Sequence, residues 1–220
     1  MKTTFQHTVC ALGLALLSLS SMAGDLGTIY TQLGTNGLGV GYGASVGDNW
    51  ALRGQVNGLK RGFSASEVGD FGSTSTINVD FNLSSVQLLG DWYPGSGGFR
   101  LTGGAVFNNN KLNVSGVGKV NNKDATVNGE LKMSDGISPY FGLGYSSRPK
   151  AAAGFGFNFD LGLMSQNPKA SLSATTTGTG AGSGLALPQS DIDAQTRKMQ
   201  DAADNFKIFP AIGLGVSYSF

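Results

Sequence analysis

The last fifteen residues of the chain alternate strictly between two kinds of side chain. Between Phe206 and Phe220 every even-numbered position is apolar or aromatic, whereas the odd-numbered positions are mostly Gly, Ser, Ala or Lys. A period of two places these two sets on opposite faces of an extended strand. The pattern therefore predicts a closing β-strand with one apolar face, and this strand ends on an aromatic residue.

The same alternation predicts seven further strands upstream. We expect them near residues 26–33, 38–46, 50–60, 76–92, 99–107, 137–145 and 151–163. Within residues 76–92 the apolar face changes from odd to even positions around Ser84 and Ser85, and a β-bulge is the simplest explanation. With the closing strand the predicted number is eight, an even number, as single-chain bacterial barrels require.

The joins between the predicted strands sort by length. The short joins are 47–49, 94–98 and 147–150, and they alternate with long polar joins near 61–75, 112–136 and 166–205. With both chain ends on the periplasmic side, the short turns would face the periplasm and the long loops the outside. A second register fuses residues 28–46 into one strand and makes 124–132 a separate strand. It also gives eight strands, but it places two short turns outside.

The last long join contains a helical pattern. Ser190 is a capping residue followed by an acid at position 193, and Ile192, Met199 and Phe206 recur every seven residues. The pattern predicts a short capped helix, over residues 194–206, that packs on the barrel rim. A plug that enters the lumen and a partner-binding element remain alternatives. Downstream, Pro210 cannot donate to a strand ladder, so it should lie near the outer end of the closing strand or at a bulge.

The first residues have the pattern of an export signal. Lys2 precedes an apolar core at 9–19, and residues 21–23 (Ser-Met-Ala) form a small-x-small cleavage site. We therefore expect a signal peptide at 1–23 and a mature domain at 24–220. No apolar run of about 20 residues follows the signal, so only a closed barrel could span a membrane.

Removal of the signal peptide leaves an electrically balanced chain. Cys10 and His7 both lie in the signal, and the remaining chain has 14 basic and 14 acidic residues. Without basic clusters there is no electrostatic footprint for nucleic acid. Without histidine, a Ser-His-acid esterase, an Asp-His protease and a histidine-based metal site are excluded. Carboxylate-only catalysis stays open but has no supporting motif, so we predict no enzyme activity and no cofactor.

Three segments carry a resemblance to a known family. They are Leu88–Pro94, Gly98–Gly104 and Pro210–Phe220. They resemble a widespread proteobacterial family of small outer-membrane barrels of uncharacterised function, with an eight-stranded architecture like that of OmpA and OmpW. The resemblance implies an all-β, eight-stranded antiparallel up-and-down transmembrane barrel in the bacterial outer membrane. Its partners would be membrane lipid and the barrel assembly machinery, which would recognise Tyr218 and Phe220 as an assembly signal.

The polar faces of the predicted strands define a lumen. If the apolar faces meet lipid, ten polar side chains line the inside: Arg53, Gln55, Asn57, Gln87, Asp91, Arg100, Thr102, Tyr140, Asn158 and Asp160. An eight-stranded barrel is only wide enough for its side chains to fill it, and an unpaired buried charge costs several kcal/mol. We therefore predict a polar cluster of paired charges in the lumen, made by Arg53, Asp91, Arg100, Tyr140 and Asp160, with the partner assignment open.

Glycines also face the predicted lumen. They are Gly39, Gly41, Gly43, Gly142, Gly144, Gly154, Gly156, Gly213 and Gly215. The space that they leave could accommodate the large Arg and Tyr side chains, or it could form a narrow conduit or a ligand pocket. The leading functional prediction is a structural protein or a narrow conduit for a small solute or an apolar ligand. Surface recognition or adhesion through the long loops, such as the polar stretch 171–184, is the alternative.

Several aromatic residues lie near the predicted short turns. Trp50, Trp92, Tyr93, Tyr145 and Tyr218 are the predicted interfacial anchors near the periplasmic edge.

Deletion of Phe220 should impair assembly of the barrel more than any single substitution in the lumen, because the aromatic end of the closing strand is the expected assembly signal. The measurement is the fraction of protein that inserts as a folded barrel in cells. Normal insertion of the deletion variant would count heavily against this interpretation.

Overall fold

The computed structural model describes residues 27–68, 74–120, 123–134, 136–147, 153–176 and 189–220. The predicted signal peptide, most of the join at 147–150 and much of the stretch 171–184 lie outside these residues. The strands are β1 (Thr28–Gly34), β2 (Gly37–Ser45), β3 (Trp50–Val68), β4 (Thr74–Trp92), β5 (Phe99–Asn108), β6 (Lys111–Val120), β7 (Lys123–Lys132), β8 (Gly136–Ser146), β9 (Gly154–Ser165), β10 (Lys169–Thr176) and β11 (Ile208–Ser219), and the helix is α2 (Gln189–Asp204).

Eight of the strands form a closed antiparallel barrel. Their order is β1, β2, β3, β4, β5, β8, β9 and β11, and β11 pairs back with β1 from Ser219 opposite Thr28 to Gly213 opposite Gly34. Beyond this seam the amide of Phe220 donates to the carbonyl of Gly27 at 3.0 Å. Closure gives the backbone groups of both terminal strands a partner, as a strand in lipid requires. The predicted eight-stranded barrel is confirmed.

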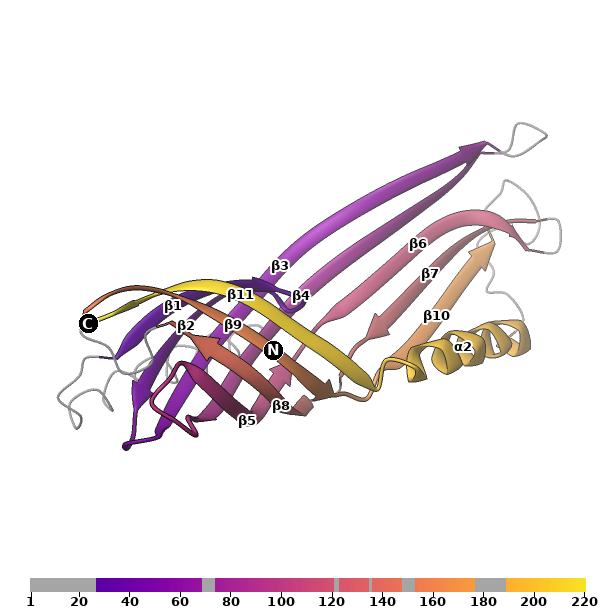
Figure 1. Cartoon of the computed structure of the whole chain (residues 1–220). Helices are drawn as coiled ribbons and strands as arrows, with labels where there is room; N and C mark the ends of the chain where they lie inside the picture. The colour runs from indigo at the N-terminus through magenta and orange to yellow at the C-terminus, as the bar shows by residue number, and fades with distance from the viewer. Residues whose placement is uncertain (1–26, 69–73, 121–122, 135, 148–152, 177–188) are drawn as a thin grey trace, which may run out of the picture.

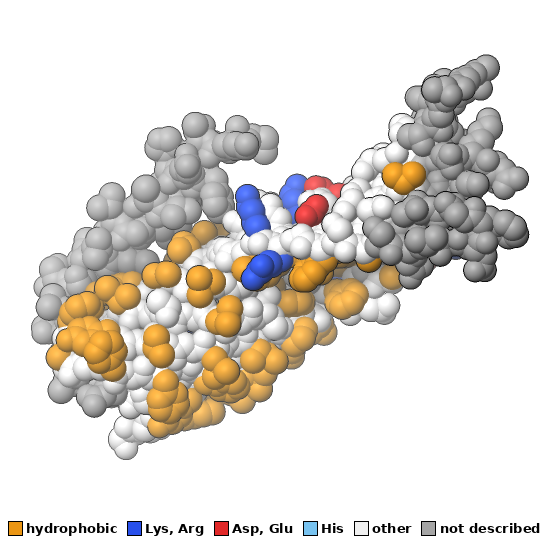
Figure 2. All heavy atoms as spheres, turned by 90° about the horizontal axis from the view of Figure 1, so that it is seen from above, with side chains coloured by type: hydrophobic (Ala, Val, Ile, Leu, Met, Phe, Trp, Pro, Cys, Tyr) orange, Lys and Arg blue, Asp and Glu red, His pale blue; other side chains and the backbone are white. Residues whose placement is uncertain are grey.

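The barrel is apolar outside and polar inside. Phe155 and Phe141 are 79% and 71% exposed on the outer surface, whereas all ten predicted lumen residues are buried. Apolar side chains cover the outside of the barrel (Figure 2). This inversion of the soluble pattern is that of a membrane-spanning barrel. Among the described residues, no helix has the length and hydropathy to cross a membrane.

The sheet also extends beyond one wall of the barrel (Figure 1). β3 and β4 are 19 residues long and pair throughout. The part of β4 from Ser85 onwards pairs with β5, but the part from Ile77 to Asn82 pairs with β6, which then pairs with β7 and, through it, β10. We call β6, β7, β10 and the adjoining ends of β3 (59–68) and β4 (74–84) the extension.

The described residues of the long joins are therefore mostly strand and helix rather than loop, and this corrects the prediction from sequence. Residues 61–75, 112–136 and 166–205 contain most of the extension and α2. Apolar residues still alternate in these strands, for example at Leu112 and Val114 of β6. They are few among polar residues and glycines, so the pattern is not evident from the sequence. In these strands only one face is apolar, and it is not a lipid-facing one.

Two further predictions of register are wrong. No bulge interrupts β4 at Ser84 and Ser85, because its pairing with β3 keeps one register from Trp92 to Thr74. The apolar positions change parity because the strand leaves the barrel there, and its inner face then needs apolar rather than polar residues. The rival register, which fuses residues 28–46 into one strand, is also wrong. These residues form two strands around a turn at Thr35 and Asn36, and residues 124–132, although they form a strand, belong to β7, outside the barrel.

Buried side-chain amides hold the point where the sheet divides into barrel and extension. Asn110 lies between β5 and β6, and its Oδ1 accepts the amide of Ser84 at 2.7 Å. The amide of Asn110 donates to Oδ1 of Asn108 at 2.9 Å. Asn108 Nδ2 donates in turn to Gln166 Oε1, between β9 and β10, at 3.2 Å. These bonds satisfy polar groups where the regular ladder is interrupted.

The predicted helix exists, but its position differs in two respects. α2 begins at Gln189, so Ser190 lies inside it rather than at its N-cap. It packs on β10 of the extension rather than on the barrel rim: Gln200 Oε1 accepts the amide of Ala170 at 2.9 Å, and Gln200 Nε2 donates to the carbonyl of Pro168 at 2.9 Å. Ile192 and Ala203 are buried, whereas Phe206 lies beyond the helix and is exposed.

The last turn of α2 has a local charge pair. Lys207 Nζ lies 2.9 Å from Asp204 Oδ2, and Gln200 Nε2 donates to Asp204 Oδ1 at 2.8 Å. The hydrogen bonds from Lys207 and Gln200 hold the pKa of Asp204 below its usual value.

Pro210 lies where the prediction placed it, near the end of β11 remote from Phe220. It is opposite Leu163 of β9, and β1 does not reach it, because β1 ends at Gly34 opposite Gly213. A residue without an amide hydrogen therefore breaks no ladder on that side.

The aromatic residues at the other end form a girdle. The ring centroids of Trp50 and Trp92 are 6.4 Å apart, and those of Tyr218 and Phe155 are 5.0 Å apart. The C-terminal ends of β2, β4 and β8 lie at this same end of the barrel, together with Gly27 and Phe220. Tyr93 is an exception among the predicted anchors, because it is buried and lines the lumen. The alternation that exposes Trp92 turns the next side chain inward.

Candidate functional site in the lumen

Four charged side chains from four strands meet in the lumen. Arg53 comes from β3, Asp91 from β4, Arg100 from β5 and Asp160 from β9. Each occupies an inward position of its strand, and all four are 7% exposed or less. We call them the charge cluster.

Asp91 is held by three donors. Arg53 Nε lies 2.5 Å from Asp91 Oδ2, and Arg53 Nη2 donates to Asp91 Oδ1 at 3.1 Å. Thr102 Oγ1 donates to Asp91 Oδ1 at 2.6 Å, and Arg100 Nε lies 3.5 Å from that oxygen. The Arg53 contact is a two-pronged guanidinium–carboxylate pair, which is the strongest ion-pair geometry.

Asp160 joins the same two arginines from the other side. Arg100 Nη2 lies 2.7 Å from Asp160 Oδ1, and Arg53 Nη2 lies 3.1 Å from it. Gln32 Nε2 donates to Asp160 Oδ2 at 2.7 Å. Each arginine therefore contacts both aspartates, so the two positive and two negative charges balance within the cluster. The predicted pairing is present, and no single arginine–aspartate pair accounts for it.

Of two buried tyrosines in the lumen, only Tyr30 contacts the charge cluster. The ring centroid of Tyr30 lies 5.7 Å from Arg53 Cζ, within the range of a cation–π contact. Tyr140, which the sequence groups with the four charges, packs instead with Leu89, Val106 and Met164 in a small apolar core.

The inward glycines make room for these large side chains. A Cβ on Gly41 would collide with the ring of Tyr30, and one on Gly144 would lie 2.7 Å from Arg100 Nε. On Gly213 it would collide with the side chain of Gln32. Of the two uses that the sequence left open for this space, the structure shows occupation by side chains at these positions.

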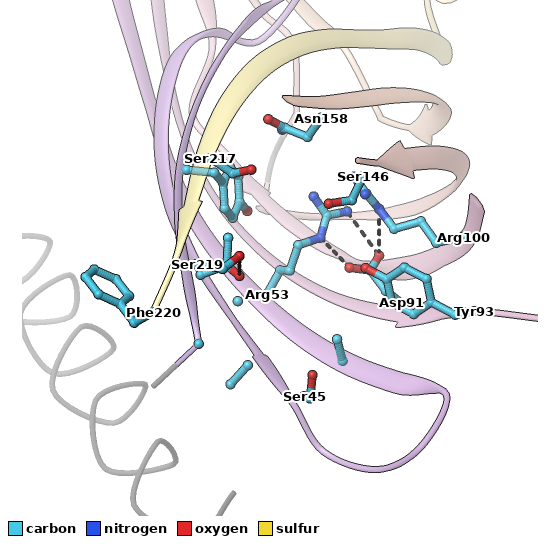
Figure 3. Close-up of a pocket in the computed structure, with 16 residues that line it drawn as sticks. Ser45, Arg53, Asp91, Tyr93, Arg100, Ser146, Asn158, Ser217, Ser219 and Phe220 are labelled. Atoms are coloured by element: carbon cyan, nitrogen blue, oxygen red, sulfur yellow. Dashed lines mark hydrogen bonds and ion pairs between the residues drawn. The ribbon is translucent and has the colours of Figure 1, made fainter. Parts of the chain in front are cut away.

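The charge cluster separates two small cavities. The cavity toward the aromatic girdle has about 60 Å³ accessible to water-sized molecules, and Tyr30, Arg53, Asp91, Arg100 and Asn158 line it (Figure 3). The cavity on the other side has about 20 Å³ and is lined by Gln32, Gln55, Gln87 and Asp160, among others. The amide oxygen and nitrogen of Asn158 and the hydroxyl of Tyr30 are buried, with no hydrogen-bond partner among the described residues.

Several lumen residues escaped the sequence analysis. They include Tyr30, Gln32, Ser85, Asn108 and Ser138, all of them buried. Tyr30 and Gln32 alternate with the exposed Ile29 and Leu33 of β1. The period-two signal was therefore present, but β1 is too short for the pattern to assign its faces from sequence. Among the described residues, no three His, Cys, Asp or Glu side chains lie close enough to hold a metal ion.

Comparison with known proteins identifies the fold. No protein-family model matches the chain, and no curated protein matches it in sequence. The structure is similar to that of CarO from Acinetobacter baumannii, with a TM-score of 0.59 and 22% identity over 89% of this chain and 98% of CarO. CarO2 from the same organism gives 0.59 and 20%, over 88% of this chain and 97% of CarO2. The likeness is one of fold. At these identities CarO supports the barrel architecture of the chain and assigns it no activity.

Asp91→Asn should destabilise the folded barrel by about 3–5 kcal/mol, because it leaves two buried arginines with one carboxylate. Urea-induced unfolding of the protein in lipid vesicles measures this change. The matched control is Asp80→Asn, which removes an exposed carboxylate from the extension and should change stability by about 0.5 kcal/mol or less. Equal effects of the two substitutions would show that the charge cluster does not stabilise the barrel.

Proposed function

We propose that the chain is an integral outer-membrane protein without catalytic activity, in which a closed barrel anchors a binding surface for apolar ligands outside the membrane. The apolar belt and polar lumen support the membrane location, and the expected export signal and closing strand favour the outer membrane. The extension is the part of the fold that the barrel itself does not require.

The side chains that occupy the lumen support the role of the barrel as an anchor. The charge cluster lies between two small cavities of about 60 and 20 Å³. A barrel of eight strands filled by its own side chains is an anchor rather than an open pore.

The inner face of the extension carries the proposal. This face continues the lumen wall beyond the barrel, and apart from Arg61 the exposed residues at its base are apolar: Leu59, Phe63, Ile77, Phe81 and Val114 are all more than a third exposed. The rings of Phe63 and Phe81 meet edge to face at 6.1 Å. α2 covers only the β7–β10 side, where Met199 lies near Gly129. A contiguous exposed apolar surface on a projecting sheet is typical of a binding site.

A narrow conduit is the second candidate. The two cavities are aligned on either side of the charge cluster, and the unpartnered polar atoms of Asn158 and Tyr30 border the larger one. In this function the four charges would form a gate, and their rearrangement would join the cavities.

Phe63→Ser combined with Phe81→Ser should weaken binding of an apolar probe by about tenfold or more, because burial of each phenyl group contributes about 1.5–3 kcal/mol. The probe is a dansylated fatty acid, titrated against the protein in nanodiscs, with empty nanodiscs subtracted. Phe141→Ser combined with Phe155→Ser is the control, since both side chains lie on the barrel exterior. If the two double variants bind the probe alike, the inner face of the extension is not the site.

Arg100→Ala should convert a silent barrel into a conducting one if the charge cluster is a gate. In planar bilayers we expect no discrete current steps from the unmodified protein and clear steps from the variant. Arg197→Ala, at an exposed position of α2, should remain silent. Silence of Arg100→Ala would reject the conduit, and steps from the unmodified protein would contradict the closed lumen.

A further inference from the structure

Four lysines form a row across the base of the extension. Lys60 of β3 pairs in register with Asn82 of β4, which pairs with Lys111 of β6. Lys111 pairs with Lys132 of β7, and Lys132 with Lys169 of β10. Residues directly opposite one another on neighbouring strands share a face of the sheet. The four side chains, which we call the lysine row, therefore lie on one face over five adjacent strands.

The lysine row is on the outward face, directly above the lipid-facing belt. On β3, Trp50, Leu52 and Val56 are exposed on the barrel exterior, and Lys60 follows them with the same parity. β3 and β4 pair without a change of register, so the face does not switch between belt and row. Charged side chains gather between the belt and the extension (Figure 2).

The height of the row matches the far surface of a membrane. Lys60 is ten residues beyond Trp50 on β3. Ten residues span about 33 Å along a strand. At the usual tilt of about 35–45° this corresponds to about 25 Å along the barrel axis, which is the height of the apolar band in membrane barrels. With the girdle of Trp50 and Trp92 at one interface, Lys60, the first lysine of the row, lies at the height of the other.

The lysine row concentrates positive charge on one face of the sheet. Lys111, Lys132 and Lys169 lie directly opposite one another on three consecutive strands. Glu130 balances part of this charge, because its Oε2 forms an ion pair with Lys111 Nζ at 3.0 Å. An ammonium has three donors, so Lys111 can hold Glu130 and a second anion together.

Two acidic residues near the lysine row lie on the side away from the membrane. Asp80 and Glu130 belong to the next row outward, opposite Asn113 of β6 from its two sides. The positive charge is therefore nearest the lipid belt, and the negative charge is farther out. An anion at the membrane surface meets the lysines first.

We propose that the lysine row binds the phosphate groups of an anionic lipid, the phosphorylated glycolipid (lipid A) of the outer leaflet. The inference rests on the proposed outer-membrane location. The acyl chains would lie against the belt residues such as Val56, and the phosphates would reach the ammonium groups above them. Because the row spans five strands about 4.8 Å apart, it is wide enough for the two phosphates of one lipid headgroup.

The test is retention of lipid by the full-length exported protein in detergent, measured by native mass spectrometry. The protein is mixed with lipid A, with lipid A from which the phosphates have been removed, or with phosphatidylcholine. We expect preferential retention of lipid A and an apparent affinity at least about tenfold weaker after Lys→Gln substitution at 60, 111, 132 and 169 together, since each lysine near an anionic surface contributes measurably to binding. High salt should reduce the difference, because exposed charges are screened.

The matched control changes the same number of charges elsewhere. Lys→Gln at 119, 123, 198 and 207 together should leave lipid A retention unchanged. Equal retention by the two quadruple variants, or equal retention of the lipid without phosphates, would overturn the proposal. Displacement of lipid A by millimolar inorganic phosphate would show a free-ion site instead and would overturn it as well.

A separate measurement keeps this inference distinct from the proposed function. Both quadruple variants should float with lipid vesicles and show the heat-dependent gel mobility of a folded barrel. If the unmodified protein does not insert into vesicles, the membrane location fails. If it inserts but the lysine row makes no difference to lipid A, only the lipid site fails.

Discussion

A strand that crosses lipid must pair every backbone amide and carbonyl within the protein, and the rest of this structure depends on that constraint. It requires the sheet to close, which it does where β11 meets β1. Closure with eight strands leaves a lumen that side chains must fill. The charged residues of that lumen are buried, so they must satisfy one another. The charge cluster is the consequence, with each arginine shared between both aspartates.

Beyond the membrane the same constraint no longer holds, and the architecture changes accordingly. The sheet divides at the level of Asn108 and Asn110. The chain is interrupted there between β5 and β6, whereas β4 is one continuous strand that pairs first with β6 and then with β5. The barrel closes on one side of this division and the extension opens on the other. The inner face changes from polar to apolar at the same level, because it no longer has to enclose a narrow lumen filled with paired charges.

The lumen was the part of the molecule most accessible to prediction. Period-two alternation identified ten inward polar residues, and all ten are buried. The partners could not be assigned, because Arg53 and Asp160 lie on strands that are not neighbours and meet only across the closed barrel. Tyr93 and the long joins were misjudged for a different reason. In both cases the alternation was present, but the sequence does not state which face is lipid, lumen or water at a given height.

The sequence by itself determined the barrel: the number of membrane strands, the inward and outward faces, and the need for charge pairing. These follow from local alternation, which depends only on the geometry of one strand. The tertiary structure decided the extension, the four-way charge cluster and the alignment of lysines from four strands. Each of these depends on register between segments far apart in the chain, and register is set by how the whole sheet closes and divides.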